Sequence, residues 1–288
     1  MWNNNRIMKN YLLPHIRRGI SEYGKVEGYK TVTNLAVKAY RNEVKSSSSS
    51  SSDNIDPRFI DMAIAQMKIF IFAGHDTTAG ALSFAYHLLW KNPATLVALR
   101  AEHDAVLGSD PVKAAANITS SPQLLNKLPY TSAVIKETLR LFPPIGTVRK
   151  GRQDFFLVYP DTGIRYPTDG FMLLGCSVAE HRNGTFWPRP DDFVPERWLV
   201  GEGDPMHVRK NAFRPFELGP RNCIGQELAQ LELRAILALT VRELDVQSAY
   251  SESGGRVLNE LAYQSMAPGE VTGHPSQGMP VRVKIRNS

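Results

Sequence analysis

The residues best suited to do chemistry lie in one glycine-rich loop, from Phe216 to Gly225. Cys223 stands just before an expected helix, whose unpaired N–H groups and dipole stabilise a thiolate. Gly219 and Gly225 have no Cβ, so the backbone can approach a flat ligand closely. Arg221 can place a cation beside a carboxylate of that ligand. This pattern indicates a site in which a cysteine thiolate binds a metal.

A second segment, Ala73-Gly74-His75-Asp76-Thr77-Thr78, places an acid beside an alcohol inside a long helical stretch. Glycine in the middle of a helix is less favourable than alanine by about 1 kcal/mol, which suggests a packing or functional reason for Gly74. Thr77 can leave a backbone hydrogen bond open and so form a groove. Taken alone, the tripeptide Asp76-Thr77-Thr78 is more often an ordinary helix cap than part of a functional site.

Two further segments carry charges that can pair. Glu137 and Arg140 lie three residues apart on an expected helix, where side chains at this spacing meet. About one such Glu-x-x-Arg pair is expected by chance in a chain of this composition, so its value rests on its order among the motifs. Arg197, in Pro195-Glu-Arg-Trp198, can join the pair.

Composition excludes several classes of protein. The chain has 288 residues, with 34 Lys+Arg against 28 Asp+Glu and only two cysteines. Two cysteines are too few for a disulfide framework, and we expect Cys176 to be a small buried residue. The basic residues are scattered, which argues against nucleic-acid binding. Pro14 and the polar residues around it do not suit a signal peptide, and no apolar run is long enough to span a membrane.

The hydrophobic pattern predicts a mainly α fold with a minor antiparallel β part. Helices are expected over 57–90, 93–108 and 129–142, short strands over 148–174 and 281–285, and ordered coil over 183–222. Two more helices are expected from apolar stripes, one formed by Val32, Leu35, Ala36 and Ala39 and one formed by Leu228, Leu231, Ala235 and Leu239. We expect a helical segment over 1–45, a serine-rich linker over 46–52 and the functional portion over 53–288.

The spacing Phe-x-x-Gly-x-Arg-x-Cys-x-Gly should occur by chance in on the order of one in 10,000 such chains. It resembles the cysteine loop of the cytochrome P450 family. Glu137-x-x-Arg140, Pro195-Glu-Arg197-Trp and Ala73-Gly-His-Asp-Thr-Thr78 are similar to further motifs of that family and stand in its order. The resemblance covers roughly residues 30 to 288, the carboxy-terminal portion of the cytochrome P450 fold.

The resemblance implies haem b as cofactor, with Cys223 as the axial ligand to the iron. It implies that Asp76 and Thr77 relay protons, and that Glu137, Arg140 and Arg197 form a buried structural network. Residues implied to contact the haem are Phe216, Gly219, Arg221, Gly225, Gly74 and Arg149, the last at a propionate. The implied activity is a monooxygenase that inserts one oxygen atom from O2 into a hydrophobic organic substrate. Electrons would come from NADPH through a flavoprotein reductase.

Further implications concern subfamily and location. The segments FAGHDTT, GPRNCIGQELA and GMPVRV look most like those of fungal secondary-metabolism members acting on polyketide-type compounds. A full-length relative is expected on the cytoplasmic face of the endoplasmic reticulum membrane, through an amino-terminal anchor that we do not find in this chain.

Two alternatives stay open. The first is a truncated, non-catalytic fragment that binds haem weakly or not at all. The second is a haem-thiolate isomerase or dehydratase, against which Thr77 counts because such relatives often lack it.

Overall fold

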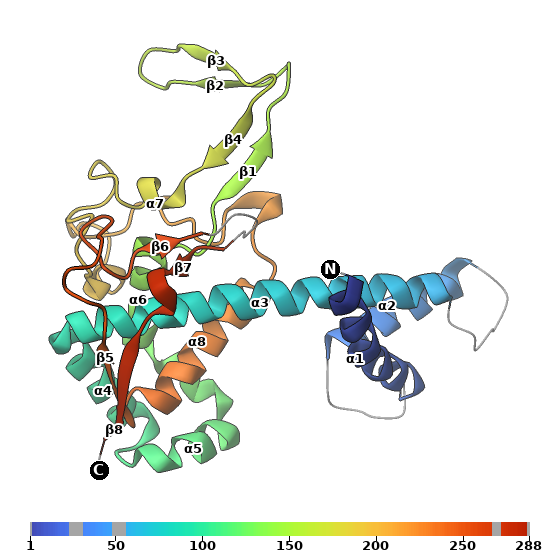
Figure 1. Ribbon diagram of the computed structural model, residues 1–288, viewed down its shortest axis with the longest axis horizontal. Coiled ribbons are helices and arrows are strands. Elements are labelled where there is room, and N and C mark those ends of the chain that lie inside the picture. Colours follow the sequence, from blue (N-terminus) through green and yellow to red (C-terminus); the bar gives the residue numbers. More distant parts are fainter. Residues whose placement is uncertain (1, 23–30, 48–55, 267–271, 287–288) are drawn as a thin grey trace. The chain divides into compact units, whose positions relative to one another are not determined.

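The computed structural model of the protein describes residues 2–22, 31–47, 56–266 and 272–286 (Figure 1). The chain forms two compact units, Met1–His75 and Asp76–Ser288. The expected mainly α fold with a minor antiparallel β part is confirmed. Most of the expected serine linker, residues 48–52, lies outside the described residues, so the predicted boundary there stays a prediction.

The first unit consists of three helical segments: α1 (Trp2–Ser21), α2 (Val32–Ser47) and the beginning of α3 (Pro57–Lys91). They bury one small apolar cluster, made of Leu12, Ile16, Val37, Phe59, Ala63 and Ile64. The rings of Tyr40 and Phe59 stack with their centroids 4.3 Å apart. Burial of apolar side chains from all three segments therefore holds this unit together.

The buried face of α2 differs from the one expected. Val32 and Leu35 are 52% and 50% exposed, whereas Val37 is fully buried against α1 and α3. The helix carries apolar residues on more than one face, and periodicity does not tell which of them meets a neighbour. The expected helix is present, but the expected stripe was wrong at Val32, Leu35 and Ala39, all of which are exposed.

The second unit is built around the remainder of α3. Its other helices are α4 (Pro93–Leu107), α5 (Ala114–Ser120), α6 (Pro129–Leu141), α7 (Ser177–Glu180) and α8 (Gln226–Thr240). Leu89, Leu99, Leu139 and Leu237, from α3, α4, α6 and α8, belong to its main core cluster. The expected helices at 57–90, 93–108 and 129–142 are confirmed, with Gly108 ending α4 at a φ of 89°.

The expected apolar stripe of α8 is largely exposed. Leu228, Leu231 and Leu239 are 67%, 40% and 36% exposed, while the core contacts come from Leu233 and Leu237. The helix is therefore apolar on two faces, of which only one packs against the core. The second apolar face begins directly after the cysteine loop.

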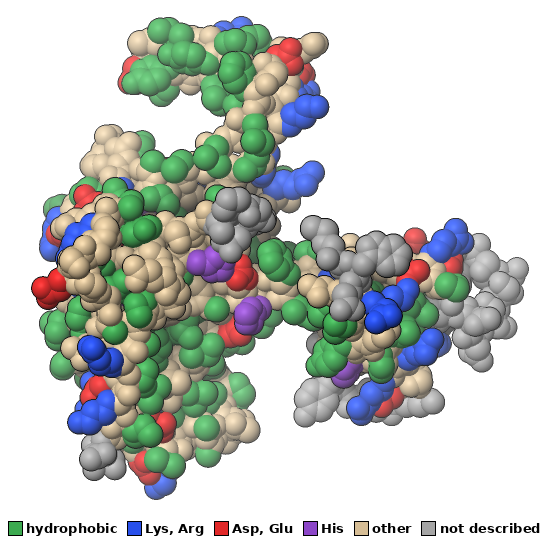
Figure 2. Space-filling model, viewed as in Figure 1, with side chains coloured by type: hydrophobic (Ala, Val, Ile, Leu, Met, Phe, Trp, Pro, Cys, Tyr) green, Lys and Arg blue, Asp and Glu red, His purple; other side chains and the backbone are tan. Residues whose placement is uncertain are grey.

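The strands form four two-stranded antiparallel sheets among the described residues. The strands are β1 (Thr147–Lys150) with β4 (Met172–Gly175), β2 (Phe156–Val158) with β3 (Arg165–Pro167), β5 (Leu244–Ser248) with β8 (Val281–Ile285), and β6 (Gln264–Ser265) with β7 (His274–Pro275). The expected strands within 148–174 and at 281–285 are confirmed. Figure 2 shows hydrophobic side chains gathered on the arm formed by β1 to β4.

Coil of residues 183–222 connects α7 to the cysteine loop, as expected. It contains only two short 3-10 turns, Pro195–Trp198 and Gly219–Arg221. Such a long coil is ordered only where its backbone groups find fixed partners. The buried charges of α6 provide them.

Candidate active site

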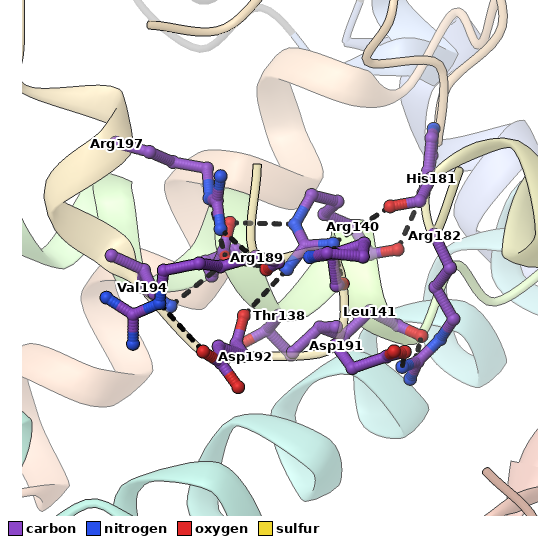
Figure 3. A network of polar contacts seen from close by, with 12 residues as sticks. Thr138, Arg140, Leu141, His181, Arg182, Arg189, Asp191, Asp192, Val194 and Arg197 are labelled. Atoms are coloured by element: carbon purple, nitrogen blue, oxygen red, sulfur yellow. Dashed lines mark hydrogen bonds and ion pairs between the residues drawn. The ribbon is translucent and has the colours of Figure 1, made fainter. Parts of the chain in front are cut away.

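A buried network of charges joins α6 to the coil that follows α7 (Figure 3). Glu137 and Arg140 form a two-point ion pair at 2.8 and 3.0 Å, and Arg197 Nε donates to Glu137 Oε1 at 3.1 Å. All three side chains are fully buried. Trp198 Nε1 also donates to Glu137, at 2.9 Å. The structure thus brings together the three residues that the sequence suggests as a network.

The two arginines of this network hold the coil by its carbonyl groups. Arg140 donates to the carbonyl oxygens of His181, Pro190 and Asp192 at 2.8, 2.6 and 2.8 Å. Arg197 donates to those of Pro188 and Arg189 at 2.8 and 3.2 Å. Burying these charges is tolerable because each guanidinium is both paired and hydrogen-bonded. The network therefore fixes the coil that leads to the cysteine loop.

His181 connects the network to the backbone just before the cysteine loop, and sequence reasoning missed it. Its Nε2 accepts the backbone N–H of Arg214 at 3.0 Å, and its Nδ1 lies 3.2 Å from the carbonyl oxygen of Arg140. The imidazole is fully buried, and burial lowers the pKa of His181 to about 4. A neutral ring that donates from Nδ1 and accepts at Nε2 satisfies both partners. No local pattern marks such a histidine, because its partners are distant in sequence.

The cysteine loop folds back on itself beneath Cys223. The backbone N–H of Cys223 donates to the carbonyl of Phe216 at 2.8 Å, and the N–H of Asn222 donates to that of Gly219 at 3.1 Å. Gly219 has a φ of +78°, a conformation that glycine adopts without steric penalty. Gly225 is the N-terminal cap of α8. The loop therefore presents an exposed thiol at the amino end of this helix.

Glu217 attaches the cysteine loop to strand β1. Its carboxylate accepts a hydrogen bond from Thr147 Oγ1 and another from Arg214 Nη2 at 3.2 Å. Although burial raises the pKa of Glu217, these hydrogen bonds and the charge of Arg214 outweigh it and leave the pKa below its usual value. Arg149 lies on the same strand and is exposed. Arg221 is exposed too, and neither arginine forms an ion pair with any described carboxylate.

Asp76 is held by the segment that leads into β7. Thr272 Oγ1 donates to Asp76 Oδ2 at 2.5 Å, and His274 Nε2 lies 3.4 Å from the same oxygen. The N–H of Gly273 donates to the carbonyl of Pro144 at 2.7 Å, in the connection between α6 and β1. The connection therefore contacts the segment that holds Asp76, and the strand that follows it contacts the cysteine loop through Thr147.

Exposed apolar side chains lie on the cysteine loop, on the first turn of α8 and near β1. Ile224, Leu228 and Leu218 are 87%, 67% and 43% exposed, and they precede or follow Cys223 within a few residues. On the connection and on β1, Ile145 and Val148 are 40% and 50% exposed. Exposed apolar side chains on the loop that carries a reactive group are typical of a binding site for an apolar ligand.

Cys176 differs from expectation. It is exposed, whereas a small buried side chain was expected. The residue caps the short helix α7 directly after β4, at the surface of the molecule, so its thiol does not reach the core. Among the described residues, no helix has the length and apolar character needed to cross a membrane.

Comparison with known proteins gives the family. The family model for cytochrome P450 matches residues 36–262. The cytochrome P450 monooxygenase polC of Polytolypa hystricis is 39% identical over 96% of this chain and 50% of its own length. The monooxygenase acrF of Aspergillus aculeatus is 34% identical over 96% of this chain and 60% of its own length.

A shorter relative aligns over almost its whole length. The monooxygenase PC-23 of Penicillium crustosum is 35% identical over 70% of this chain and 99% of its own length. The present chain spans 50% and 60% of the lengths of polC and acrF, respectively. The similarity extends over the cysteine loop, the buried charge network and the acid–alcohol segment alike. The chain belongs to the cytochrome P450 family.

Proposed function

We propose that this chain is the haem-binding portion of a monooxygenase that inserts one oxygen atom from O2 into a hydrophobic organic substrate. The observation that carries the proposal is the exposed thiol of Cys223, placed at the amino end of α8, with exposed apolar side chains at nearby positions of the loop and the helix. We assign Cys223 as the axial ligand of the iron. A thiolate at a helix amino end is stabilised by the N–H groups there.

The residues present fit haem b. A planar apolar macrocycle requires apolar contacts around the thiolate, which Ile224 and Leu228 offer. Its propionates require cations, and Arg149 and Arg221 are exposed guanidinium groups without carboxylate partners among the described residues. A Cβ at Gly74 would meet no described atom within 4 Å, so packing within the described chain does not demand glycine there.

The remaining cofactor contacts assigned from the motif are Phe216, Gly219 and Gly225. The ring of Phe216 packs against the main core cluster, and its carbonyl oxygen accepts a hydrogen bond from the N–H of Cys223. These two contacts tie the position of Cys223 to the core. A Cβ at Gly225 would lie 3.9 Å from Cys223 Sγ, an ordinary van der Waals contact, so this backbone position is directly beside the sulfur. We therefore assign these three residues to the positioning of the thiolate.

Haem, when bound, supplies the iron that activates dioxygen, and a thiolate ligand favours cleavage of the O–O bond. The side chains of this protein relay protons and hold the cysteine loop in place. Asp76 and Thr77, neighbours on α3, relay protons. The carboxylate of Asp76 carries the proton, and the hydroxyl of Thr77 is the next group in the relay. Glu137, Arg140 and Arg197 hold the coil that carries the thiolate.

The partners follow from this chemistry. Dioxygen activation needs electrons, which we assign to NADPH delivered through a flavoprotein reductase. Ile145 and Val148 offer an apolar wall to the substrate. We propose a substrate from fungal secondary metabolism on the resemblance of the FAGHDTT, GPRNCIGQELA and GMPVRV segments; the relatives polC and acrF are named as fungal monooxygenases. For the whole protein we propose the cytoplasmic face of the endoplasmic reticulum membrane.

A carbon monoxide spectrum tests the proposal. The chain loaded with haem, reduced and exposed to carbon monoxide should show the red-shifted band of a thiolate-bound iron, and Cys223→Ser should abolish it. Cys176→Ser is the matched control, since it removes the other exposed thiol and should leave the band intact. An ordinary haem band in the unaltered chain would overturn the assignment of Cys223 and favour a non-catalytic fragment.

A second measurement separates a monooxygenase from an isomerase or dehydratase. The haem-loaded chain with a flavoprotein reductase in air should consume NADPH, because dioxygen reduction requires electrons. A chain that shows the thiolate band but consumes no NADPH would support the electron-independent alternative.

A further inference from the structure

The acid of the proposed proton relay is in contact with the carboxy-terminal part of the chain. Asp76 lies in the middle of α3, and Thr272 is 196 residues further on, yet Thr272 Oγ1 donates to Asp76 Oδ2 at 2.5 Å. His274 Nε2 lies 3.4 Å from the same oxygen, within ion-pair distance. Three groups able to hold or pass a proton therefore meet at one carboxylate oxygen.

The segment that carries His274 is fixed on both sides. The N–H of Gly273 donates to Pro144, and Gln264 Nε2 donates to the carbonyl of Pro143 at 2.8 Å. His274 itself begins β7 and pairs with Ser265 of β6. A Cβ at position 273 would lie 3.0 Å from Gln264 Nε2, so a larger residue there would push the Gln264 amide aside from the carbonyl of Pro143. The position of the imidazole beside Asp76 is therefore set by the fold.

The three groups differ in their exposure to solvent. Thr272 is buried, with 3% of its surface exposed, whereas the side chains of Asp76 and His274 are 26% and 32% exposed. Among the described residues, the ion pair between Asp76 and His274 is the only one that either of them forms. The imidazole thus contacts both solvent and the carboxylate, and its two nitrogens allow it to take a proton at one and release it from the other.

We propose that His274 is the entry of the proton path that recharges Asp76, with Thr272 holding the carboxylate in place. This inference rests on the function proposed above. The protonated imidazole gives its Nε2 proton to Asp76 Oδ2 and becomes neutral. Asp76 passes a proton on along α3 and returns to the carboxylate. The ring left behind carries its remaining proton at Nδ1; exchange with solvent shifts this proton to Nε2, and uptake of one solvent proton at Nδ1 restores the protonated imidazole for the next transfer. No electrons move in these steps.

The turnover experiment uses the haem-loaded chain with a flavoprotein reductase, NADPH and air-saturated buffer, with dioxygen as the probe. His274→Gln keeps a polar side chain but removes the group that can both take and release a proton. We expect NADPH consumption to fall roughly tenfold and its solvent deuterium isotope effect to rise. This loss is smaller than the roughly 100-fold or more expected on removing a general acid that touches the reacting group, because the Asp76 side chain is 26% exposed and water can still protonate it slowly. The thiolate band with carbon monoxide should not change, which separates this role from a structural one.

His15→Gln is the matched control, because His15 is an exposed histidine on α1. It should leave both the rate and the isotope effect at their original values. Thr272→Val should lower the rate less than His274→Gln, because it loosens the carboxylate without removing the proton donor. Unchanged rate and isotope effect in His274→Gln would overturn the proposal.

A measurement that needs no turnover keeps the inference separate from the proposed function. In the chain labelled with 15N-histidine, the Nε2 resonance of His274 is identified by its loss in His274→Gln. Asp76→Asn should shift this resonance and leave that of His15 in place. No shift would overturn the proton contact, whether or not the chain consumes NADPH. A shift in a chain that consumes no NADPH would support the contact and refute the monooxygenase instead.

Discussion

Replacing His181 with glutamine tests how the buried charge network is joined to the cysteine loop. The imidazole of His181 is fully buried between Arg140 and the backbone of Arg214. Both of its nitrogens are used, one as donor and one as acceptor, so a second proton would destroy the hydrogen bond from the N–H of Arg214. Burial, together with the charges of Arg140 and Arg214, lowers the pKa of His181 to about 4, against 6.5 for a free side chain.

The pKa of His181 in the folded chain is lower than in the unfolded chain, and this difference makes the free energy of unfolding depend on pH. Between these two pKa values the unfolded chain binds more protons than the folded chain, so the free energy of unfolding falls as the pH falls from 6.5 towards about 4. Near pH 5 the slope from one such histidine is about 1 kcal/mol per pH unit, and the whole window is worth about 3 kcal/mol. His103, whose burial also lowers its pKa to about 4, should add a similar amount.

The assay is urea unfolding followed by tryptophan fluorescence at pH 7, 6 and 5, since the ring of Trp187 lies 5.9 Å from that of His181. His181→Gln should lower the free energy of unfolding at pH 7 and reduce its slope with pH by about 1 kcal/mol per unit. His103→Gln should reduce the slope by a similar amount, and His15→Gln, an exposed position, should not. A His181→Gln chain with the original slope would refute the reasoning.

Three further changes test other parts of the site. Glu137→Gln should lower the free energy of unfolding by roughly 3 to 5 kcal/mol in urea, because it leaves two buried arginines without their shared carboxylate; a loss below 1 kcal/mol would contradict the network. Thr147→Val should lower it by about 1 kcal/mol through the lost bond to Glu217, and limited proteolysis should then cut the cysteine loop faster, whereas an unchanged cleavage rate would argue against this attachment. Arg221→Gln should weaken haem binding in a spectroscopic titration but leave unfolding of the haem-free chain within about 0.5 kcal/mol, since the side chain is exposed; unaltered haem affinity would remove Arg221 from the site.

The main helices were predictable because their signals are local. Pro93 begins α4 and Gly108 ends it, and Pro129 begins α6. Proline at the first turn and glycine after the last one act through backbone dihedrals that need no distant partner. The strands around 148–174 followed in the same way from their turn residues.

The buried faces of the helices were less predictable. In α8 the leucines at 228 and 231 are exposed, while Leu233 and Leu237 pack into the core. A helix that is apolar on two sides has two possible buried faces, and only its neighbours select one. Similarly, Cys176 was expected in the core but lies exposed after β4, because the strand ends at the surface.

The sequence by itself determined the family, the order of the elements and the residue types at the site, because Cys223, Glu137 and Arg140 act within motifs of fixed spacing. Only the tertiary structure decided that His181 joins the network to the cysteine loop and that His274 meets Asp76. The physical reason is that both histidines act through hydrogen bonds and ion pairs to residues far along the chain, which form only once packing has brought those segments together.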